Sequence, residues 1–162
     1  MTSMSKAVHR VRAVSSNDQN SKLRIGVVVS RFNELFCQQM EASVLDELSL
    51  LGVLNEHITV VSVPGALEIP AALQALALKD EFDALIALGV VIRGQTYHFE
   101  VVSLHSAEGV MSVGLDHHIP IANGVLTVET EDQAQVRVEV KSRECARAAV
   151  EMVHLFHHIE SV

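Results

Sequence analysis

The chain has 162 residues, which is enough for a single domain with a substantial buried core. Hydrophobic residues make up 49% of the chain and aromatic residues only 4%, so Ala, Val, Leu and Ile must build that core. The formal net charge of −8 argues against binding to nucleic acid or to an anionic membrane. No segment approaches the roughly 18 consecutive apolar residues of a membrane-spanning helix.

The first 22 residues differ from the rest in charge. They carry four of the twelve basic residues but only one acidic residue, Asp18. The segment lacks the apolar stretch of a secretory signal, and its weak likeness to a transit peptide is not supported by a sustained apolar face. We therefore predict a flexible N-terminal arm over residues 1–22 and a single α/β domain over residues 23–162.

The two cysteines, Cys37 and Cys145, lie far apart and form no Cys-x-x-Cys motif. Free thiols in a reducing compartment are the default interpretation of such a pair. We therefore expect a cytoplasmic protein.

Apolar strands and amphipathic helices alternate along the predicted domain. The hydrophobic pattern predicts strands over 23–30, 58–63, 84–88 and 119–126. It predicts helices over 33–51, from about Pro70, over 97–116, after a Thr130-x-x-Gln133 capping box, and from about Ser142 to His158. This alternation is typical of a flavodoxin-like three-layer sandwich, in which helices flank a four-stranded parallel sheet.

Four segments that carry polar or aromatic residues follow or end the four predicted strands. They are Ser30–Asn33, Val63–Pro70, Gly89–His98 and Asn123–Thr127. Open parallel sheets bind ligands beyond the carboxyl ends of their strands. The sequence therefore predicts one site to which all four segments contribute.

The segment Leu88–His98 has the features of an anion site. Its two glycines permit close approach of the backbone to a ligand, and a helix start presents unpaired N–H groups. Gln95 and Thr96 would supply these amides, although Thr96 could simply cap the helix. His98 lies in the first helical turn, where it could donate or accept a proton near neutral pH.

Three further side chains have both a structural and a functional interpretation. Phe32 is either a hydrophobic staple or a flat surface for a heterocycle. Glu68 either favours a helix N-terminus or binds a polar substrate. Arg137, in a basic cluster with Lys141, Arg143 and Arg147, either faces solvent or clamps a phosphate with its planar fork.

In this order the four segments, with Gln133-Ala134 and Arg137 after them, resemble the signature of the 6,7-dimethyl-8-ribityllumazine synthase family. The resemblance covers roughly residues 23 to 160. It implies an enzyme of riboflavin biosynthesis that condenses 5-amino-6-(D-ribitylamino)uracil with 3,4-dihydroxy-2-butanone 4-phosphate. It also implies that the reaction requires no cofactor and no metal.

The resemblance assigns a role to each candidate residue. His98 takes the proton-transfer role. The pyrimidine and ribityl chain are bound by Phe32, Ala66, Leu67, Glu68, Val90, Val91, Ile92 and Asn123. The phosphate is bound by Gln95, Thr96 and Arg137, with Lys141 as a further candidate if a short gap is allowed.

Two departures from the family pattern affect the expectations. Asn123 stands where many members carry a Phe that packs on the pyrimidine. Only Val138-Glu139-Val140 separates Arg137 from Lys141, where icosahedral members carry a longer Gly-Thr-Lys-Ala-Gly-Asn-like loop. The resemblance implies active sites shared between subunits. The short loop favours a homopentamer, with an icosahedral shell of sixty chains as the alternative.

Two other functions are compatible with parts of the pattern. A flavodoxin-like module could bind a flavin or lumazine without turnover, and a shell protein could have a purely structural role. Three histidines, His154, His157 and His158, share a helix face at metal-like spacing, but no carboxylate or thiolate accompanies them in sequence. We therefore predict an enzyme that acts on small molecules, with no metal site.

Overall fold

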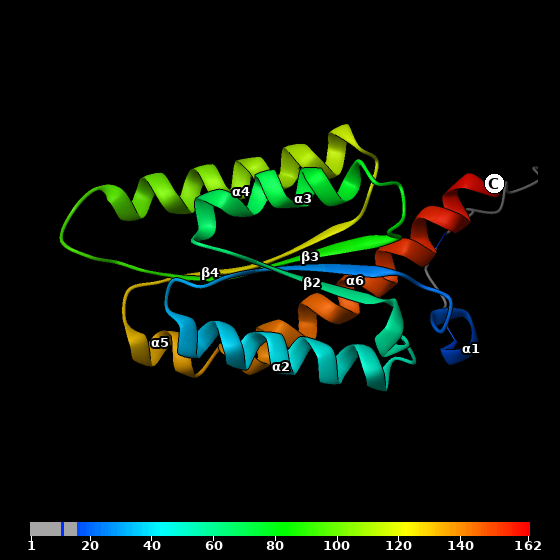
Figure 1. The fold of residues 1–162 in the computed structure, drawn as a ribbon, viewed down its shortest axis with the longest axis horizontal. Coiled ribbons are helices and arrows are strands. Elements are labelled where there is room, and N and C mark those ends of the chain that lie inside the picture. Colours follow the sequence, from blue (N-terminus) through cyan, green and yellow to red (C-terminus); the bar gives the residue numbers. More distant parts are fainter. Residues whose placement is uncertain (1–10, 12–15) are drawn as a thin grey trace, which may run out of the picture.

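A four-stranded parallel sheet with the order β2-β1-β3-β4 forms the centre of the computed structural model, which describes residue 11 and residues 16–162 (Figure 1). Its strands are β1 (Ile25–Ser30), β2 (Ile58–Val63), β3 (Ala84–Ile92) and β4 (Ile121–Val128). All neighbouring strands pair in parallel, because each connection crosses the sheet through a helical segment. The predicted α/β class is confirmed.

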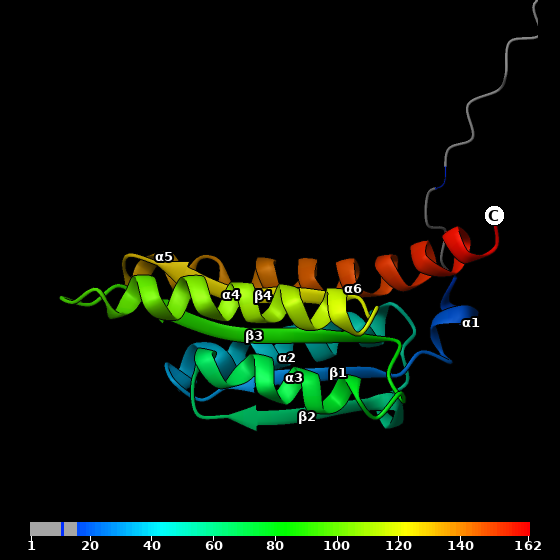
Figure 2. The ribbon, with the colours of Figure 1, turned by 90° about the horizontal axis from the view of Figure 1, so that it is seen from above.

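Helices cover both faces of this sheet, so the predicted three-layer sandwich is also confirmed (Figures 1 and 2). One face carries α3 (Ile69–Ala77) and α4 (His98–Asp116), and the other carries α2 (Glu34–Leu50) and α6 (Val138–Glu160). Shorter elements are α1 (Asn17–Asn20), α5 (Glu131–Gln135) and the 3-10 turns η1 (Asn55–His57) and η2 (Ala66–Glu68). In the part of the chain that the structure describes, every helix is too short or too polar to cross a bilayer.

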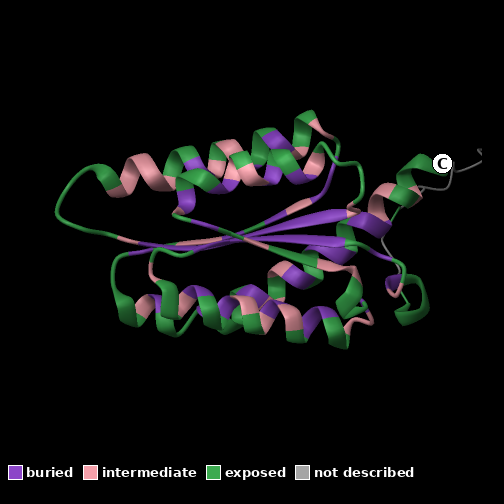
Figure 3. Cartoon of the chain, in the orientation of Figure 1, coloured by how far each residue is buried: buried purple, intermediate pink, exposed green. Residues whose placement is uncertain are grey.

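The core lies in two layers, one on each side of the sheet (Figure 3). Strand β1 is buried along its whole length because strands flank it on both sides and helices cover both faces. From α2, Met40, Val44 and Leu48 are fully buried at a spacing of four residues. Leu35, near the start of the same helix, is 75% exposed.

Strand β3 is longer than predicted and passes straight through Gly89. The predicted end of this strand at residue 88 is wrong, because pairing with β4 continues to Ile92 and Val128. A Cβ on Gly89 would come within 3.0 Å of Ser30 Oγ, so tight packing rather than a turn requires glycine here. Strand β4 likewise begins and ends two residues later than predicted.

Two helix starts also differ from the prediction. Helix α6 begins at Val138, four residues before the predicted start at Ser142. The Ser142 hydroxyl lies inside the helix and donates to the carbonyl of Val138. Helix α4 begins at His98, whose N–H donates to Thr96 Oγ1 at 3.4 Å. The capping box before α5 forms as predicted, since Thr130 Oγ1 accepts from the Gln133 N–H at 3.2 Å.

Asn20 anchors α1 to the domain. Its Nδ2 donates to the carbonyl of Leu51 at 2.7 Å, and its Oδ1 lies 2.7 Å from His154 Nε2. Most of the predicted arm, residues 1–10 and 12–15, lies outside the described residues. Asn20 belongs to the predicted arm, before the domain boundary predicted at Leu23, but it makes these contacts with the domain.

Candidate functional site

A cavity of about 480 Å³ lies at the edge of the sheet where the strands end. Residues from four segments line it: the loop after β1, the turn η2, the end of β3 and the start of α4. The lining consists of Phe32, Gly65, Ala66, Leu67, Glu68, Val90, Val91, Ile92, Gly94, Thr96, His98, Phe99 and Val102. The predicted convergence of three of the four polar segments therefore occurs within one chain.

Hydrogen bonds between loops fix the first wall of this cavity. The Arg31 N–H donates to the carbonyl of Val63 at 2.8 Å, and the Phe32 N–H donates to that of Pro64 at 3.1 Å. Asn33 donates from Nδ2 to the carbonyl of Val90 at 2.8 Å. The loop after β1 is thus held to the ends of both β2 and β3.

Asn33 connects the start of α2 to strand β3. It occupies the N-cap position of α2, but its side chain accepts no capping hydrogen bond because it reaches across to β3 instead. Its φ of 60° is left-handed, a conformation that Asn tolerates better than most residues. Asn33 therefore orients Phe32 rather than capping the helix by its side chain.

Phe32 is 72% exposed, so it is not buried as a hydrophobic staple would be. Behind it, Cys37 Sγ donates to the Phe32 carbonyl at 3.4 Å. Burial raises the pKa of Cys37, so this group stays a neutral thiol at neutral pH. An exposed ring on a fixed backbone can stack on a flat ligand.

The turn η2 presents Glu68 to the cavity. A Cβ on Gly65 would come within 3.1 Å of Glu68 Oε2, so the glycine leaves room for this carboxylate. The first N–H groups of a helical turn have no acceptor within the turn. The N–H groups of Ala66 and Leu67 are therefore suited to donate hydrogen bonds to oxygen atoms of a ligand. Carboxylate and amides together suit a polyhydroxylated ligand.

The loop between β3 and α4 contributes Gly94, Thr96 and His98 to the lining. A Cβ on Gly94 would meet no heavy atom within 4 Å, so packing in this chain does not require glycine there. The open space beside Gly94 allows a ligand to approach the backbone. Gln95, the other predicted phosphate ligand of this loop, is exposed and does not line the cavity.

The lining also includes residues that sequence reasoning missed: Gly65, Phe99 and Val102. Val102 lies one helical turn after His98, and this i, i+4 spacing could have identified it. Phe99 carried no such signal, because residues adjacent in a helix point in different directions.

Three predicted ligands lie away from the cavity. Asn123 Oδ1 accepts from the Val125 N–H at 3.0 Å within its own strand. Arg137 lies between α5 and α6, where Nη1 donates to the carbonyl of Gln133 at 2.8 Å. Lys141 Nζ is 2.7 Å from Glu144 Oε2.

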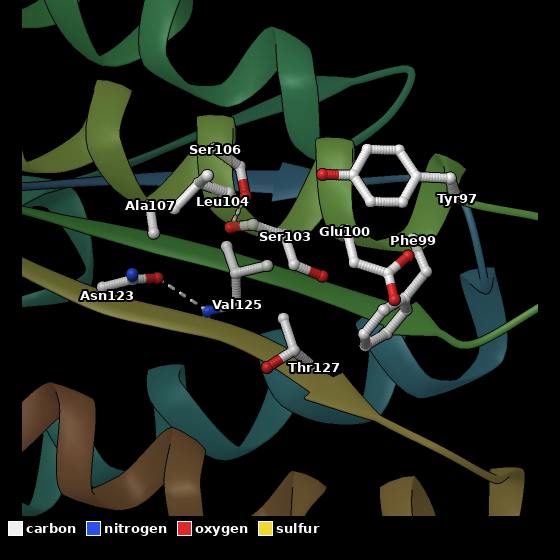
Figure 4. A pocket seen from close by; sticks show the side chains of 10 residues that line it. All are labelled: Tyr97, Phe99, Glu100, Ser103, Leu104, Ser106, Ala107, Asn123, Val125 and Thr127. Carbon is white, nitrogen blue, oxygen red and sulfur yellow. Dashed lines mark hydrogen bonds between the residues drawn. The ribbon is translucent and has the colours of Figure 1, made fainter.

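Asn123 instead lines a second hollow of about 540 Å³ between α4 and β4 (Figure 4). Asn123, Val125 and Thr127 of β4 point toward α4 in this hollow. Two buried atoms facing this region, Glu100 Oε2 and Ser103 Oγ, have no hydrogen-bond partner in the described part of the chain. Phe99 lines both the cavity and the second hollow.

Helix α4 also carries an exposed apolar stripe. Tyr97, Leu104 and Met111 recur at a spacing of seven residues and are 75%, 56% and 68% exposed. Leu115, one turn further on, is 76% exposed. A stripe with this spacing faces one direction, as expected for a helix that packs against another helix.

This arrangement defines an α/β protein that binds small molecules beyond the carboxyl ends of a parallel sheet, with an exposed aromatic ring, a carboxylate and a histidine around one cavity. The family model described as 6,7-dimethyl-8-ribityllumazine synthase matches residues 22–157. The chain belongs to this family.

Several curated relatives carry the same name, 6,7-dimethyl-8-ribityllumazine synthase. The one from Methylibium petroleiphilum is 59% identical over 137 residues, which cover 85% of this chain and 86% of the relative. The one from Cupriavidus necator is 53% identical over 147 residues, covering 91% and 89%. The one from Burkholderia cenocepacia is 55% identical over 139 residues, covering 86% and 81%.

Proposed function

We propose that the chain is a 6,7-dimethyl-8-ribityllumazine synthase. It condenses 5-amino-6-(D-ribitylamino)uracil with 3,4-dihydroxy-2-butanone 4-phosphate and releases phosphate and water. The observation that carries this proposal is the convergence of Phe32, Glu68 and His98 on one cavity in a chain of this family.

The chemistry demands little beyond placement and proton transfer. The primary amine of the pyrimidine attacks the ketone and forms an imine with loss of water, phosphate leaves, and ring closure eliminates a second water. These steps balance without an oxidant or a reductant. Holding two reactants in register can lower a barrier by up to about 7–11 kcal/mol. Proton transfer by His98 would add a factor of about 10²–10⁴.

The cavity suggests how the pyrimidine substrate is held. Phe32 stacks on the ring, and the strand end Val90–Ile92 supplies the apolar floor beneath it. Glu68 and the amides of Ala66 and Leu67 bind the ribityl hydroxyls. His98 also lines the cavity, next to the loop whose amides, at Gln95 and Thr96, receive the phosphate.

We further propose that an adjacent subunit completes each site. Asn123, Arg137 and Lys141 do not reach the cavity of their own chain, so they would act on that of a neighbour. The exposed stripe on α4 and the unpartnered Glu100 and Ser103 atoms support a contact there. Five chains whose α4 helices pack around a common axis form a homopentamer.

The cytoplasm is the location we propose for this assembly. The only two cysteines of the chain form no disulfide. Burial raises the pKa of Cys145 to about 11, so this thiol also stays protonated. Two free thiols suit a reducing compartment.

Mixing the purified protein with both substrates and following lumazine fluorescence tests the proposed activity. The proposal expects product that accumulates in many-fold excess over the protein. A non-catalytic flavin or lumazine binder would bind added lumazine but form none, and that result would refute the enzymatic function.

A further inference from the structure

We propose that Arg93 is a positioning residue that fixes the loop before α4 and, through Phe99, the wall of the cavity. This inference rests on the proposed function, because its consequence is the placement of His98 and of the phosphate-binding amides. It concerns a side chain that does not itself line the cavity.

Arg93 joins two elements that meet at the end of the sheet. Its Nε donates to Glu129 Oε2 at 2.6 Å, just after β4, and its Nη1 donates to Glu100 Oε1 in the first turn of α4. Its backbone N–H donates to the carbonyl of Val128 at 2.9 Å. One residue therefore fixes the positions of the end of β3, the end of β4 and the start of α4.

The guanidinium also lies over an aromatic ring. Its central carbon is 4.2 Å from the centroid of the Phe99 ring, a cation–π distance. Phe99 lines the cavity and directly follows His98. Arg93 therefore holds the helical turn that carries the proposed proton-transfer group from two sides, through Glu100 and through Phe99.

The charges around Arg93 distinguish this role from direct binding of phosphate. The hydrogen bonds with Glu100 and Glu129 raise the pKa of Arg93, and the bond from Arg93 lowers the pKa of Glu100. Two carboxylates thus offset the positive charge of the guanidinium. A phosphate anion approaching Arg93 would meet two negative groups, so this arginine is suited to positioning rather than to anion binding.

The loop that Arg93 precedes has few other restraints. Within the described structure, the hydrogen bonds from residues 94–98 stay inside the loop and the first turn of α4, such as that from the His98 N–H to Thr96 Oγ1. Loss of the Arg93 side chain would leave the backbone hydrogen bond to Val128 and the packing of Phe99 on the core, neither of which restrains residues 94–98 directly. A displacement of about 1 Å at a reacting group can cost about 10² in rate.

The test compares Arg93→Ala with Arg143→Ala by steady-state kinetics. Arg143 also pairs with carboxylates, those of Asp46, Glu47 and Glu139, but on the opposite face of the sheet. We expect Arg93→Ala to lower kcat/KM for the butanone phosphate by about ten- to hundredfold. The KM for the pyrimidine should change little, because other hydrogen bonds hold Phe32. Arg143→Ala should lower the melting temperature without this selective effect.

Conservative variants provide a readout that a loss of stability would not move. Arg93→Lys should restore part of the kcat/KM, because a lysine can pair with one carboxylate but lacks the fork. Glu129→Gln should have a smaller effect than Arg93→Ala. Combined with Arg93→Ala it should add nothing, because both variants break the same contact.

The outcomes separate the two proposals. If the wild-type protein forms no lumazine, the proposed function fails, whatever Arg93 does. If the wild type is active but Arg93→Ala matches Arg143→Ala in both KM values and in kcat, the positioning role is refuted. Equal losses for both substrates, with no recovery in Arg93→Lys, would refute it as well.

Discussion

At the scale of single residues, His98 and Arg137 differ in whether they lie at the cavity of their own chain. His98 faces a cavity that its own chain builds. Arg137 is exposed, and one of its nitrogens bonds to the carbonyl of Gln133, one turn earlier. This geometry holds the guanidinium at the surface, where a second chain could bring a substrate to it.

Replacing Arg137 with Ala should raise the KM for the butanone phosphate well above that for the pyrimidine, since a charge-assisted fork to phosphate is lost. Arg137→Lys should recover only part of the affinity. Steady-state kinetics with each substrate varied in turn measure both effects. Small, equal changes in the two KM values would contradict the phosphate role.

Replacing His98 with Ala should lower kcat by no more than about 10²–10⁴ and leave measurable turnover, because orientation supplies most of the acceleration. His105→Ala is the matched control: this histidine lies on the same helix, is exposed and pairs with Glu108 at 3.0 Å. It should leave kcat unchanged. Complete loss of activity in a folded His98→Ala protein would show that proton transfer dominates.

Much of the cavity could be predicted from local sequence. Phe32, Glu68 and His98 were identifiable because each follows the end of a strand, and strand ends meet at one edge. The hydrogen bonds from Asn33 to Val90 and from Arg93 to Glu129 were not identifiable, because they join residues 57 and 36 positions apart. Such pairs depend on sheet order, which the hydrophobic pattern does not contain.

At the scale of elements, α2 and α6 are joined by a nearly buried carboxylate. The Glu47 side chain is 7% exposed, and it accepts from Arg147 Nε at 2.6 Å and from Arg143 Nη1 at 3.0 Å. These hydrogen bonds, above all that from Arg147, lower the pKa of Glu47. The folded state therefore binds a proton at this site less readily than the unfolded state does.

Glu47 should make stability depend on pH. Because its folded pKa is lowered, its contribution is fully present above the unfolded carboxyl pKa of about 4.3 and is lost as the pH falls through the lower folded value. Glu47→Gln should cost about 1–3 kcal/mol at neutral pH. Thermal unfolding at a series of pH values should show the gap to wild type narrowing under acidic conditions.

Glu139→Gln serves as the control for this prediction. Glu139 also pairs with Arg143, but its side chain is 70% exposed and its contribution should be small. If the difference in stability between wild type and Glu47→Gln stayed constant down to acidic pH, the predicted contribution of the Glu47 carboxylate would be wrong.

The element boundaries show where the sequence pattern stopped being informative. Strand β2 matched its predicted range because Pro64 and Gly65 interrupt the pattern after Val63. Strand β3 did not, because a glycine within a parallel strand cannot be distinguished from one in a turn until the pairing partner is known. Helix α6 began early because no residue before Ser142 marks its start as a side-chain cap.

At the scale of the whole molecule, exposed apolar side chains gather along helix α4. The stripe Tyr97, Leu104, Met111 and Leu115 leaves large apolar side chains exposed on α4. Beside it lies the hollow with two unpartnered polar atoms. Both features support the proposal that α4 packs against another chain.

Light scattering after gel filtration should find a closed ring of five chains of 17.7 kDa each, about 88 kDa. Met111→Glu should shift the ring toward smaller species, because it places a charge in the apolar stripe. An active monomer would refute the shared active site. A particle of megadalton mass would show that the short segment between Arg137 and Lys141 does not limit assembly.

The shared position of Phe99, between the cavity and the second hollow, has a thermodynamic consequence. If a neighbouring chain fills the hollow, its association and the binding of substrate both act on this one ring. The coupling free energy between the two events is then reciprocal. Bound substrate raises the affinity between subunits by the same factor by which assembly raises the affinity for substrate. Diluted protein should accordingly lose specific activity, and saturating substrate should delay that loss to lower protein concentrations.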